Sequence, residues 1–247
     1  MLKSFSSALS FLTVFRIPYT DSILSPKELA ASFACFPLAG LVLGGIYYGT
    51  AFLLRGRVPL LLLAVLIASL TVLLTRGLHL DGLADFADGV WGGSTPERRL
   101  EIMKDSRVGT FGVLALIIAL GLKIAAIEAG LEANYLAVLL VAPVFSRFAM
   151  AAAAFGSIYA RKEGLGKPFL ENMTAKHLML AAVFAAIASS PAGIASILYL
   201  IAVLVCVFGM RTISVKFLGG ITGDVLGAVN EISETVVLVL GACVVHG

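Results

Sequence analysis

Long apolar segments recur along the whole chain, and they restrict the fold more than any other feature of the sequence. They fall at 33–54, 58–75, 109–130, 135–157, 177–190, 194–210 and 225–245. Most approach the roughly 20 residues that an α-helix needs to cross about 30 Å of hydrocarbon. Only 13% of the residues are charged and the mean hydropathy is +1.02, far from the values of soluble domains. The pattern predicts an all-α, polytopic membrane bundle of about six or seven transmembrane helices.

The segment ahead of the first apolar run predicts a short helix that lies in the membrane interface. Its apolar residues recur at helical spacing, but it is too short to cross the bilayer. They are Phe5, Ala8, Leu9, Leu12 and Phe15. No tandem repeat or linker interrupts the chain, so residues 1–247 are expected to form a single domain. The net charge of +3 gives no overall field that favours nucleic acid.

Basic residues are distributed very unevenly between the two sets of connections. If the N-terminus is cytoplasmic, seven spans place residues 1–32, 76–108, 158–176 and 211–224 on that side, and 55–57, 131–134 and 191–193 on the other. The first set holds fourteen Lys and Arg residues, whereas the second holds only Arg55 and Arg57. Cytoplasmic loops of membrane proteins carry such an excess. The polar loops are therefore expected on the cytoplasmic side.

The connection after the second apolar segment carries the densest group of carboxylates. Asp81, Asp85 and Asp88 follow that segment, and Asp105 precedes the next one. On a continuous helix the first three share one face, and their mutual repulsion costs free energy unless a cation lies between them. Hard oxygen ligands indicate Mg²⁺ or Mn²⁺. The alternative is that these aspartates only solvate a loop, as most loop charges do.

Neighbouring glycines and cations favour a phosphate-binding role over simple solvation. Gly82 and Gly89 stand beside the aspartates, and glycine lets a backbone approach a phosphate closely. Asp105 and Arg107, at the mouth of the next span, are well placed to bind metal and phosphate respectively. This region predicts a metal-dependent phosphotransfer site.

A second polar cluster, YARKEGLGKPF, covers residues 159–169. Arg161 and Lys167 flank its two glycines, an arrangement that suits phosphate or nucleotide binding. Cations near a membrane also commonly set topology or contact lipid headgroups, and that alternative stays open.

A third cluster, LGGITGDVLGAVNEISE, opens the last apolar segment. Asp224 and Glu231 fall on one helical face with Gly227, which is small enough for close helix packing or ligand approach. Acidic residues in an apolar helix usually have a function, so both are candidates for the site.

Three further ionisable residues have ambiguous roles. Lys123 and Arg147 lie within predicted spans, where a charge is costly unless it is paired or reaches water. His79 precedes Asp81 by two residues and is more typical of a structural histidine than of a base or ligand. It is not included among the primary site residues.

Six motifs, in order, resemble the cobalamin synthase family, the adenosylcobinamide-GDP ribazoletransferases. They are FLTVFRIP, FPLAGLVLGG, HLDGLADFADG, RRLEIMKDSRVGTFG, YARKEGLGKPF and GGITGDVLGA. The resemblance runs over nearly the whole chain. It implies a multi-pass enzyme of a bacterial or archaeal cytoplasmic membrane, with its active site facing the cytoplasm.

The resemblance also implies the reaction. Such an enzyme joins α-ribazole or its 5′-phosphate to adenosylcobinamide-GDP, releases GMP, forms adenosylcobalamin or its 5′-phosphate, and requires Mg²⁺. Membrane lipids and other enzymes of cobalamin biosynthesis are the further partners expected, and nucleic acid is not.

Roles on this sequence follow as hypotheses. The predicted metal ligands are Asp81, Asp85, Asp88 and Asp105. The predicted catalytic carboxylates are Asp81, Asp85, Asp105, Asp224 and Glu231. Phosphate or nucleotide contacts are assigned to Gly82, Gly89, Arg107, Arg161 and Lys167. The carboxylate that accepts the hydroxyl proton is left open.

Three other readings compete with this one. The aspartates partly resemble those of the CDP-alcohol phosphotransferases, so a lipid alcohol is an alternative acceptor. A transporter would place Lys123, Arg147, Glu231 and Glu234 along a permeation path. A non-catalytic scaffold would leave the crowded aspartates unexplained.

Overall fold

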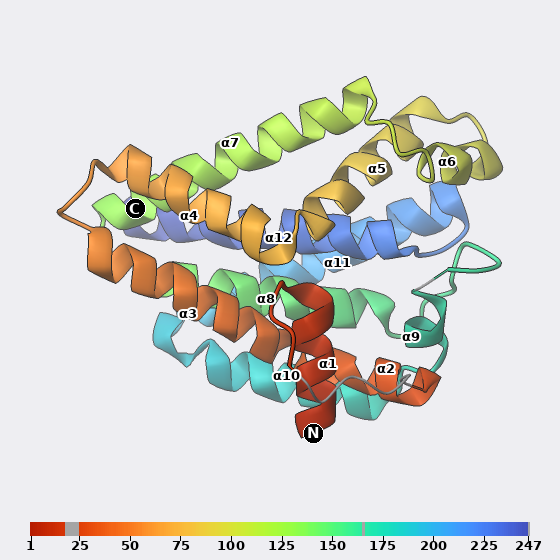
Figure 1. Cartoon of the computed structure of the whole chain (residues 1–247), viewed down its shortest axis with the longest axis horizontal. Helices are drawn as coiled ribbons and strands as arrows, with labels where there is room; N and C mark the ends of the chain where they lie inside the picture. The colour runs from red at the N-terminus through yellow and green to blue at the C-terminus, as the bar shows by residue number, and fades with distance from the viewer. Residues whose placement is uncertain (18–24, 165, 247) are drawn as a thin grey trace.

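The computed structural model describes residues 1–17, 25–164 and 166–246, and helices dominate it (Figure 1). Within that part of the chain there is no strand, and only two isolated β-bridges occur. The helices in the first half are α1 (Leu2–Leu12), α2 (Pro26–Ser32), η2 (Phe33–Cys35), α3 (Phe36–Leu54), α4 (Leu60–Thr75), α5 (Leu78–Gly92) and α6 (Pro96–Ile102). Those in the second half are α7 (Thr110–Glu132), α8 (Ala137–Ala154), α9 (Lys167–Glu171), α10 (Ala175–Ala188), η3 (Ser190–Ala192), α11 (Ala195–Leu218) and α12 (Gly223–His246).

The predicted all-α polytopic bundle is confirmed, with a change in the number of spans. Among the described residues, five helical segments are long and apolar enough to cross a membrane: Pro26–Leu54, α7, α8, α11 and Gly223–Val244. Helices α4 and α5 pass the same test only as a pair, which is bent by 89°. The segment predicted at 177–190 forms α10, whose 14 residues are fewer than a span needs. The described helices give five spans, or six if α4 and α5 form one bent span, against the predicted six or seven.

Helix α12 lies at the centre of the bundle, in contact with α5, α7, α8 and α11. Helix α8 packs against α12 and also against α3, and the α3–α8 contact is close. Gly40 and Gly44 face the backbone carbonyl groups of Pro143 and Leu140, where a side chain on either glycine would collide. Small residues at such crossings let membrane helices approach closely. The core of the bundle is therefore built around α3, α8 and α12.

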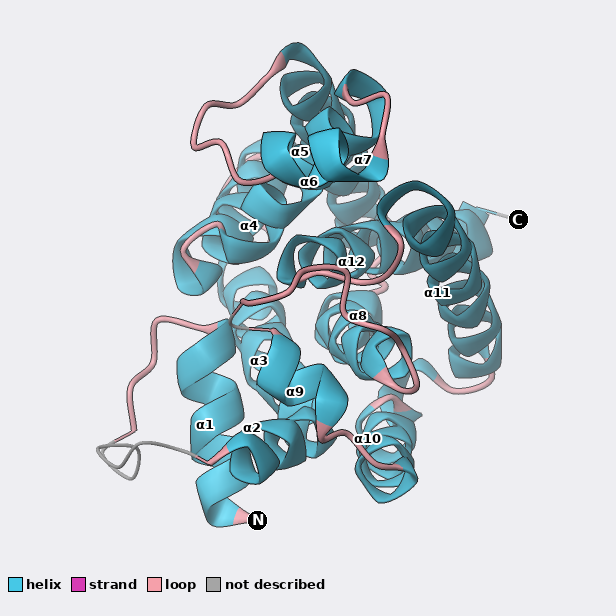
Figure 2. Cartoon of the chain, turned by 90° about the vertical axis from the view of Figure 1, so that its right-hand side faces the viewer, coloured by secondary structure: helices cyan, strands magenta, loops and turns pink. Residues whose placement is uncertain are grey.

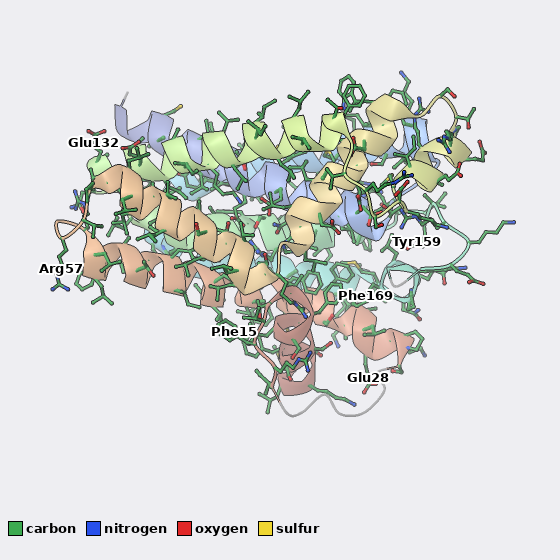
Figure 3. The ribbon with its side chains drawn as sticks, turned by 45° about the horizontal axis from the view of Figure 1, so that its top comes forward. Phe15, Glu28, Arg57, Glu132, Tyr159 and Phe169 are labelled. Atoms are coloured by element: carbon green, nitrogen blue, oxygen red, sulfur yellow. The ribbon has the colours of Figure 1, made fainter. Side chains whose placement is uncertain are left out.

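The connections separate into two ends of the molecule (Figure 1). The α3–α4 connection and the C-terminus lie at one end, whereas α2, α6 and α9 lie toward the other. Figure 3 shows the same division, with Arg57 and Glu132 at one end and Tyr159 and Phe169 toward the other. The predicted grouping of the polar loops is thus reproduced, and we call the second end the loop-rich end.

A sharp bend between α4 and α5 brings the aspartate segment back onto the bundle. Arg76 and Gly77 both adopt left-handed backbone conformations, with φ of 56° and 67°, which end α4 and start α5 in a new direction. Glycine accepts such a φ without strain. Residues 78–92, expected to belong to a polar connection, instead form a helix that packs on α7 and α12.

Candidate functional site

A cavity of about 300 Å³ lies where α5 and α12 meet, toward the loop-rich end. Four of the predicted site residues line it, namely Asp81, Gly82, Arg161 and Asp224. The other lining residues are Phe11, Phe33, Phe36, Leu78, His79, Met150, Tyr159, Gly164, Gly166, Phe169, Gly223, Leu226 and Gly227. The cavity therefore collects residues from all three polar clusters of the sequence.

Two glycines allow α5 and α12 to meet at the cavity. A Cβ atom on Gly82 would lie 2.8 Å from the carbonyl oxygen of Asp224, and one on Gly227 would lie 3.3 Å from the Cα atom of Gly82. The first distance leaves no room for a side chain, and the second would force the neighbouring backbone to shift. Gly82 thus lets α5 and α12 approach closely, so that Asp81 and Asp224 line the same cavity. The nearest neighbour of Gly82 is the backbone of α12.

Arg161 is held against Asp224 by a short pairing of two loops. The amide of Ala160 donates to the carbonyl of Ile221 over 2.9 Å, and the amide of Ile221 donates to the carbonyl of Ile158 over 2.8 Å. The Arg161 guanidinium then donates to the Asp224 carboxylate over 2.6 Å. The side chains are 14% and 23% exposed, so this ion pair is partly shielded from water and borders the cavity.

The carboxylates of α5 are crowded, as the sequence predicts for one helical face. Asp85 lies near enough to Asp81, Asp88 and Asp224 to be repelled by their negative charges. The positive charge of Arg161 partly offsets this repulsion. Asp81 and Asp85 form no ion pair within the described ranges, and Asp81 is exposed. Among the described residues, no three acidic, histidine or cysteine side chains converge on one point that would enclose a metal.

Asp88 holds the beginning of α7. Its carboxylate accepts hydrogen bonds from the amides of Gly109 over 2.7 Å and of Gly112 over 2.9 Å. Free amides in the first turn of a helix favour a carboxylate partner. A side chain on either glycine would collide with Asp88. In this geometry both oxygens of Asp88 are occupied by backbone, and Gly89 packs against Met103.

Asp105 and Arg107 pair with each other in a second hollow, at the far end of α5 and beside Asp88. Two nitrogens of the Arg107 guanidinium donate to the Asp105 carboxylate, the shorter bond measuring 2.6 Å. The hydrogen bonds and charge of Arg107 lower the pKa of Asp105 to about 2. These two residues do not line the α5–α12 cavity, and their binding of metal and phosphate stays a prediction.

Lys167 and Glu231 also lie away from the cavity lining. Lys167 donates to the carbonyl of Lys162 over 2.8 Å and lies 3.8 Å from the carboxylate of Glu171. Glu231 is two helical turns beyond Asp224 on α12 and is 5% exposed. Its carboxylate pairs with Lys123 over 2.8 Å.

Glu231 belongs to a buried ion cluster that contains the intramembrane cations noted in the sequence. Lys123 also donates to Glu234 over 3.1 Å, and Arg147 pairs with Glu234 and with Ser146. Lys123 and Arg147 are 0% and 1% exposed. Two positive and two negative charges thus neutralise one another, instead of serving the permeation path that a transporter would require.

Several cavity residues were not identified as site residues from sequence. Tyr159 lies against Gly164 and Gly166, and burial raises the pKa of its hydroxyl. His79 is 1% exposed, and neither ring nitrogen has a hydrogen-bond partner within the described part of the chain. Its place in HLDG, two residues before Asp81, was the available signal. The phenylalanines of the lining carry no comparable local signal, because they come from three separate parts of the chain, around residues 11, 33–36 and 169.

Comparison with known proteins gives a consistent result. A model of the family described as cobalamin-5-phosphate synthase matches residues 4–242. A relative from Syntrophobacter fumaroxidans, named adenosylcobinamide-GDP ribazoletransferase, is 53% identical over 249 residues, which cover 98% of this chain and 99% of the relative. Relatives of the same name from Pseudomonas syringae and Klebsiella pneumoniae are 41% identical over 218 residues and 36% identical over 242 residues. They cover 87% and 96% of this chain, and 88% and 98% of their own lengths. No solved structure matches the chain.

Proposed function

Since the chain belongs to the cobalamin-5-phosphate synthase family, a family of enzymes, we propose that it catalyses the ribazole transfer named for its relatives. The donor is adenosylcobinamide-GDP and the acceptor is α-ribazole or its 5′-phosphate. The products are GMP and adenosylcobalamin or its 5′-phosphate. One observation carries the proposal: α5, α12 and the connection between α8 and α9 bring Asp81, Asp224 and Arg161 to a single cavity.

The reaction is a displacement at phosphorus. A hydroxyl oxygen of the acceptor attacks the β-phosphorus of the donor, which carries the cobinamide. The bond from that phosphorus to the bridging oxygen breaks, and GMP leaves with the bond's electron pair. The acceptor loses its proton to a carboxylate, for which Asp81 and Asp85 on α5 are the candidates. Positioning and neutralisation of charge contribute most of the catalysis in such transfers.

The carboxylates in and beside the cavity suit Mg²⁺. Asp81 and Asp224 line it, Asp85 does not, and all three are hard oxygen donors whose charges interact. Mg²⁺ usually binds through one or two carboxylates together with substrate phosphates, so three protein side chains around one point are not required. Bound there, Mg²⁺ would neutralise negative charge on the diphosphate.

Arg161 and the beginning of α12 favour the binding of the diphosphate. The guanidinium of Arg161 has donors beyond those it directs at Asp224, and Arg matches phosphate geometry. Gly223 lines the cavity at the first turn of α12, a helix of 24 residues. Amides in the first turn of a long helix attract phosphate.

The enzyme is a multi-pass membrane protein, and we place its cavity on the cytoplasmic side of the cytoplasmic membrane. The excess of basic residues in the connections at the loop-rich end supports this orientation. The donor and the acceptor would then both reach the cavity from the cytoplasm.

The direct test uses the full chain, reconstituted in liposomes with adenosylcobinamide-GDP and α-ribazole, with and without Mg²⁺. Chromatography should detect GMP and the cobamide product in equal amounts, and only with the metal. Absence of product from folded protein would refute the proposal. A lipid alcohol offered as competing acceptor separates this reaction from that of a phospholipid-type phosphotransferase.

A further inference from the structure

A groove of about 770 Å³ lies on the outside of the bundle between α10 and α11. Figure 2 shows these two helices on either side of α8. Helix α8 contributes Ala152 to the lining and α10 contributes Leu178, whereas most of the lining belongs to α11. We call this hollow the α10–α11 groove. The proposed transfer reaction uses none of its residues.

The α10–α11 groove is apolar at one end and positively charged at the other. Leu204 and Phe208 are 45% and 75% exposed, and they share one face of α11 with Arg211. Lys216 lies in the last turn of α11, which ends at Leu218 beside α6 at the loop-rich end. At about 1.5 Å per residue, both cations lie within roughly 10 Å of that end. An apolar surface thus leads to two cations at the depth where the helix leaves the hydrocarbon.

Neither cation is neutralised by a carboxylate. The Arg211 guanidinium donates to the carbonyl of Phe155 over 2.9 Å and to that of Gly156 over 3.5 Å, which orients it and leaves its charge in place. The Lys216 ammonium lies 5.4 Å from the centre of the Phe217 ring. Among the described residues, neither side chain forms an ion pair. The sequences of α10 and α11 contain no acidic residue that could supply one.

We propose that the α10–α11 groove binds an anionic phospholipid from the membrane leaflet at the loop-rich end. One acyl chain packs against Leu204 and Phe208, and the phosphate lies between Arg211 and Lys216. Basic pockets between transmembrane helices bind anionic headgroups, and each Lys or Arg near the membrane surface strengthens such binding about five-fold. This site is separate from the α5–α12 cavity, and the inference does not depend on the proposed reaction.

Charge favours a lipid over a second copy of the chain as the occupant of the groove. A symmetric contact between two such faces would direct Arg211 and Lys216 toward the same residues of the other copy. Because α10 and α11 have no carboxylate, these like charges would repel one another. An anionic phospholipid supplies the missing negative charge and the apolar chain in one molecule.

The test uses the purified full chain in a neutral detergent, titrated with phosphatidylglycerol or with phosphatidylcholine of the same acyl chains. Native mass spectrometry counts the lipids bound to each chain. One phosphatidylglycerol should bind at least about ten-fold more tightly than any phosphatidylcholine. Lys216→Gln should weaken its binding about five-fold, and Arg211→Gln combined with Lys216→Gln about 30-fold. Binding of phosphatidylcholine should change little.

Matched controls separate the groove from the overall charge of the protein. Arg57→Gln combined with Lys104→Gln removes the same charge from two exposed residues outside the groove lining, and it should bind phosphatidylglycerol as the wild type does. Arg211→Gln also removes hydrogen bonds to the end of α8, so its Tm is measured alongside. Arg211→Lys keeps the charge and should lose less affinity than Arg211→Gln. Lys216→Gln alone changes an exposed side chain, so its loss of affinity cannot result from misfolding.

Each alternative result would overturn the proposal. Equal affinity for the two lipids would mean that the groove takes any lipid, and equal losses in the groove and control variants would place the site elsewhere. Glycerophosphoglycerol, the headgroup without acyl chains, should not displace the lipid. If it competed as well as the whole lipid, the cations would form a simple anion site. Dimers that exclude phosphatidylglycerol would assign the groove to a second copy.

Discussion

Helix α12 contributes acidic residues to two groups of charges that differ in burial and in pairing. At its beginning, Asp224 pairs with Arg161 beside a cavity, and the nearby Asp81 is exposed and forms no ion pair among the described residues. Two turns later, Glu231 begins a buried cluster in which four opposite charges satisfy one another. The first group keeps uncompensated negative charge in contact with solvent. The second keeps none.

The difference separates function from structure. Charges that are buried and mutually paired stabilise one arrangement of α7, α8 and α12, and no ligand is needed to complete them. Carboxylates held together without enough cations are unfavourable until a cation or substrate arrives. Residue type alone does not distinguish the two groups, because each combines acidic residues of α12 with basic partners from other segments.

The largest effect is expected from breaking the buried cluster. Glu234→Leu leaves Lys123 and Arg147 buried with one carboxylate between them, and we expect the free energy of unfolding to fall by about 3–5 kcal/mol. Denaturation in mixed micelles measures it. Glu97→Gln, on the exposed face of α6, is the control and should change nothing. A stable Glu234→Leu protein would show that the cluster does not stabilise the fold.

Asp81→Asn is the corresponding change on the open side. It removes a charge that has no ion-pair partner in the described structure, so the unfolding free energy should hold or rise slightly. Turnover should fall by about 10²–10³ because the site loses a proposed Mg²⁺ ligand and a candidate base. Liposome assays across a range of Mg²⁺ concentrations measure the loss. If Asp81→Asn were as unstable as Glu234→Leu and otherwise fully active, the contrast between the two groups would be wrong.

Arg161→Lys sharpens the comparison at its boundary, because Arg161 is both paired and part of the cavity. Lysine retains the charge but not the planar set of donors that can reach Asp224 and a phosphate together. We expect turnover to fall about ten-fold with little change in unfolding free energy. The KM for the donor should rise more than that for α-ribazole. An equal rise for both substrates would argue against diphosphate binding by Arg161.

The sequence predicts the general architecture because its strongest signals are local. Apolar length indicates the spans, and the spacing of Asp81 and Asp85 indicates a shared helical face. The bend at Gly77 was not predicted, because the end of the apolar run does not indicate the direction of the helix that follows. Asp88 could not be separated from its neighbours, because its role depends on Gly109 and Gly112, more than twenty residues away. The phenylalanines that line the cavity come together only through the packing of three separate parts of the chain, so they leave no local pattern.

The smallest effect is expected at Asp105 and Arg107, which pair at the surface in the second hollow. Asp105 has a pKa lowered from 3.8 to about 2, so any stabilisation by this pair is present above pH 4 and is lost as the pH falls toward 2. Because the pair is exposed, Arg107→Gln should shift the Tm only slightly, by a constant amount between pH 5 and 8, and less in high salt. Thermal unfolding in detergent over this pH range measures the shift.

Turnover of Asp105→Asn should fall less than about ten-fold, well short of the loss in Asp81→Asn. A loss as large as that of Asp81→Asn would mean that the metal and phosphate roles predicted for this hollow are correct. The group of charges at the cavity would then continue along α5 to the second hollow. A donor that spans the cavity and the second hollow would need the charged residues of both.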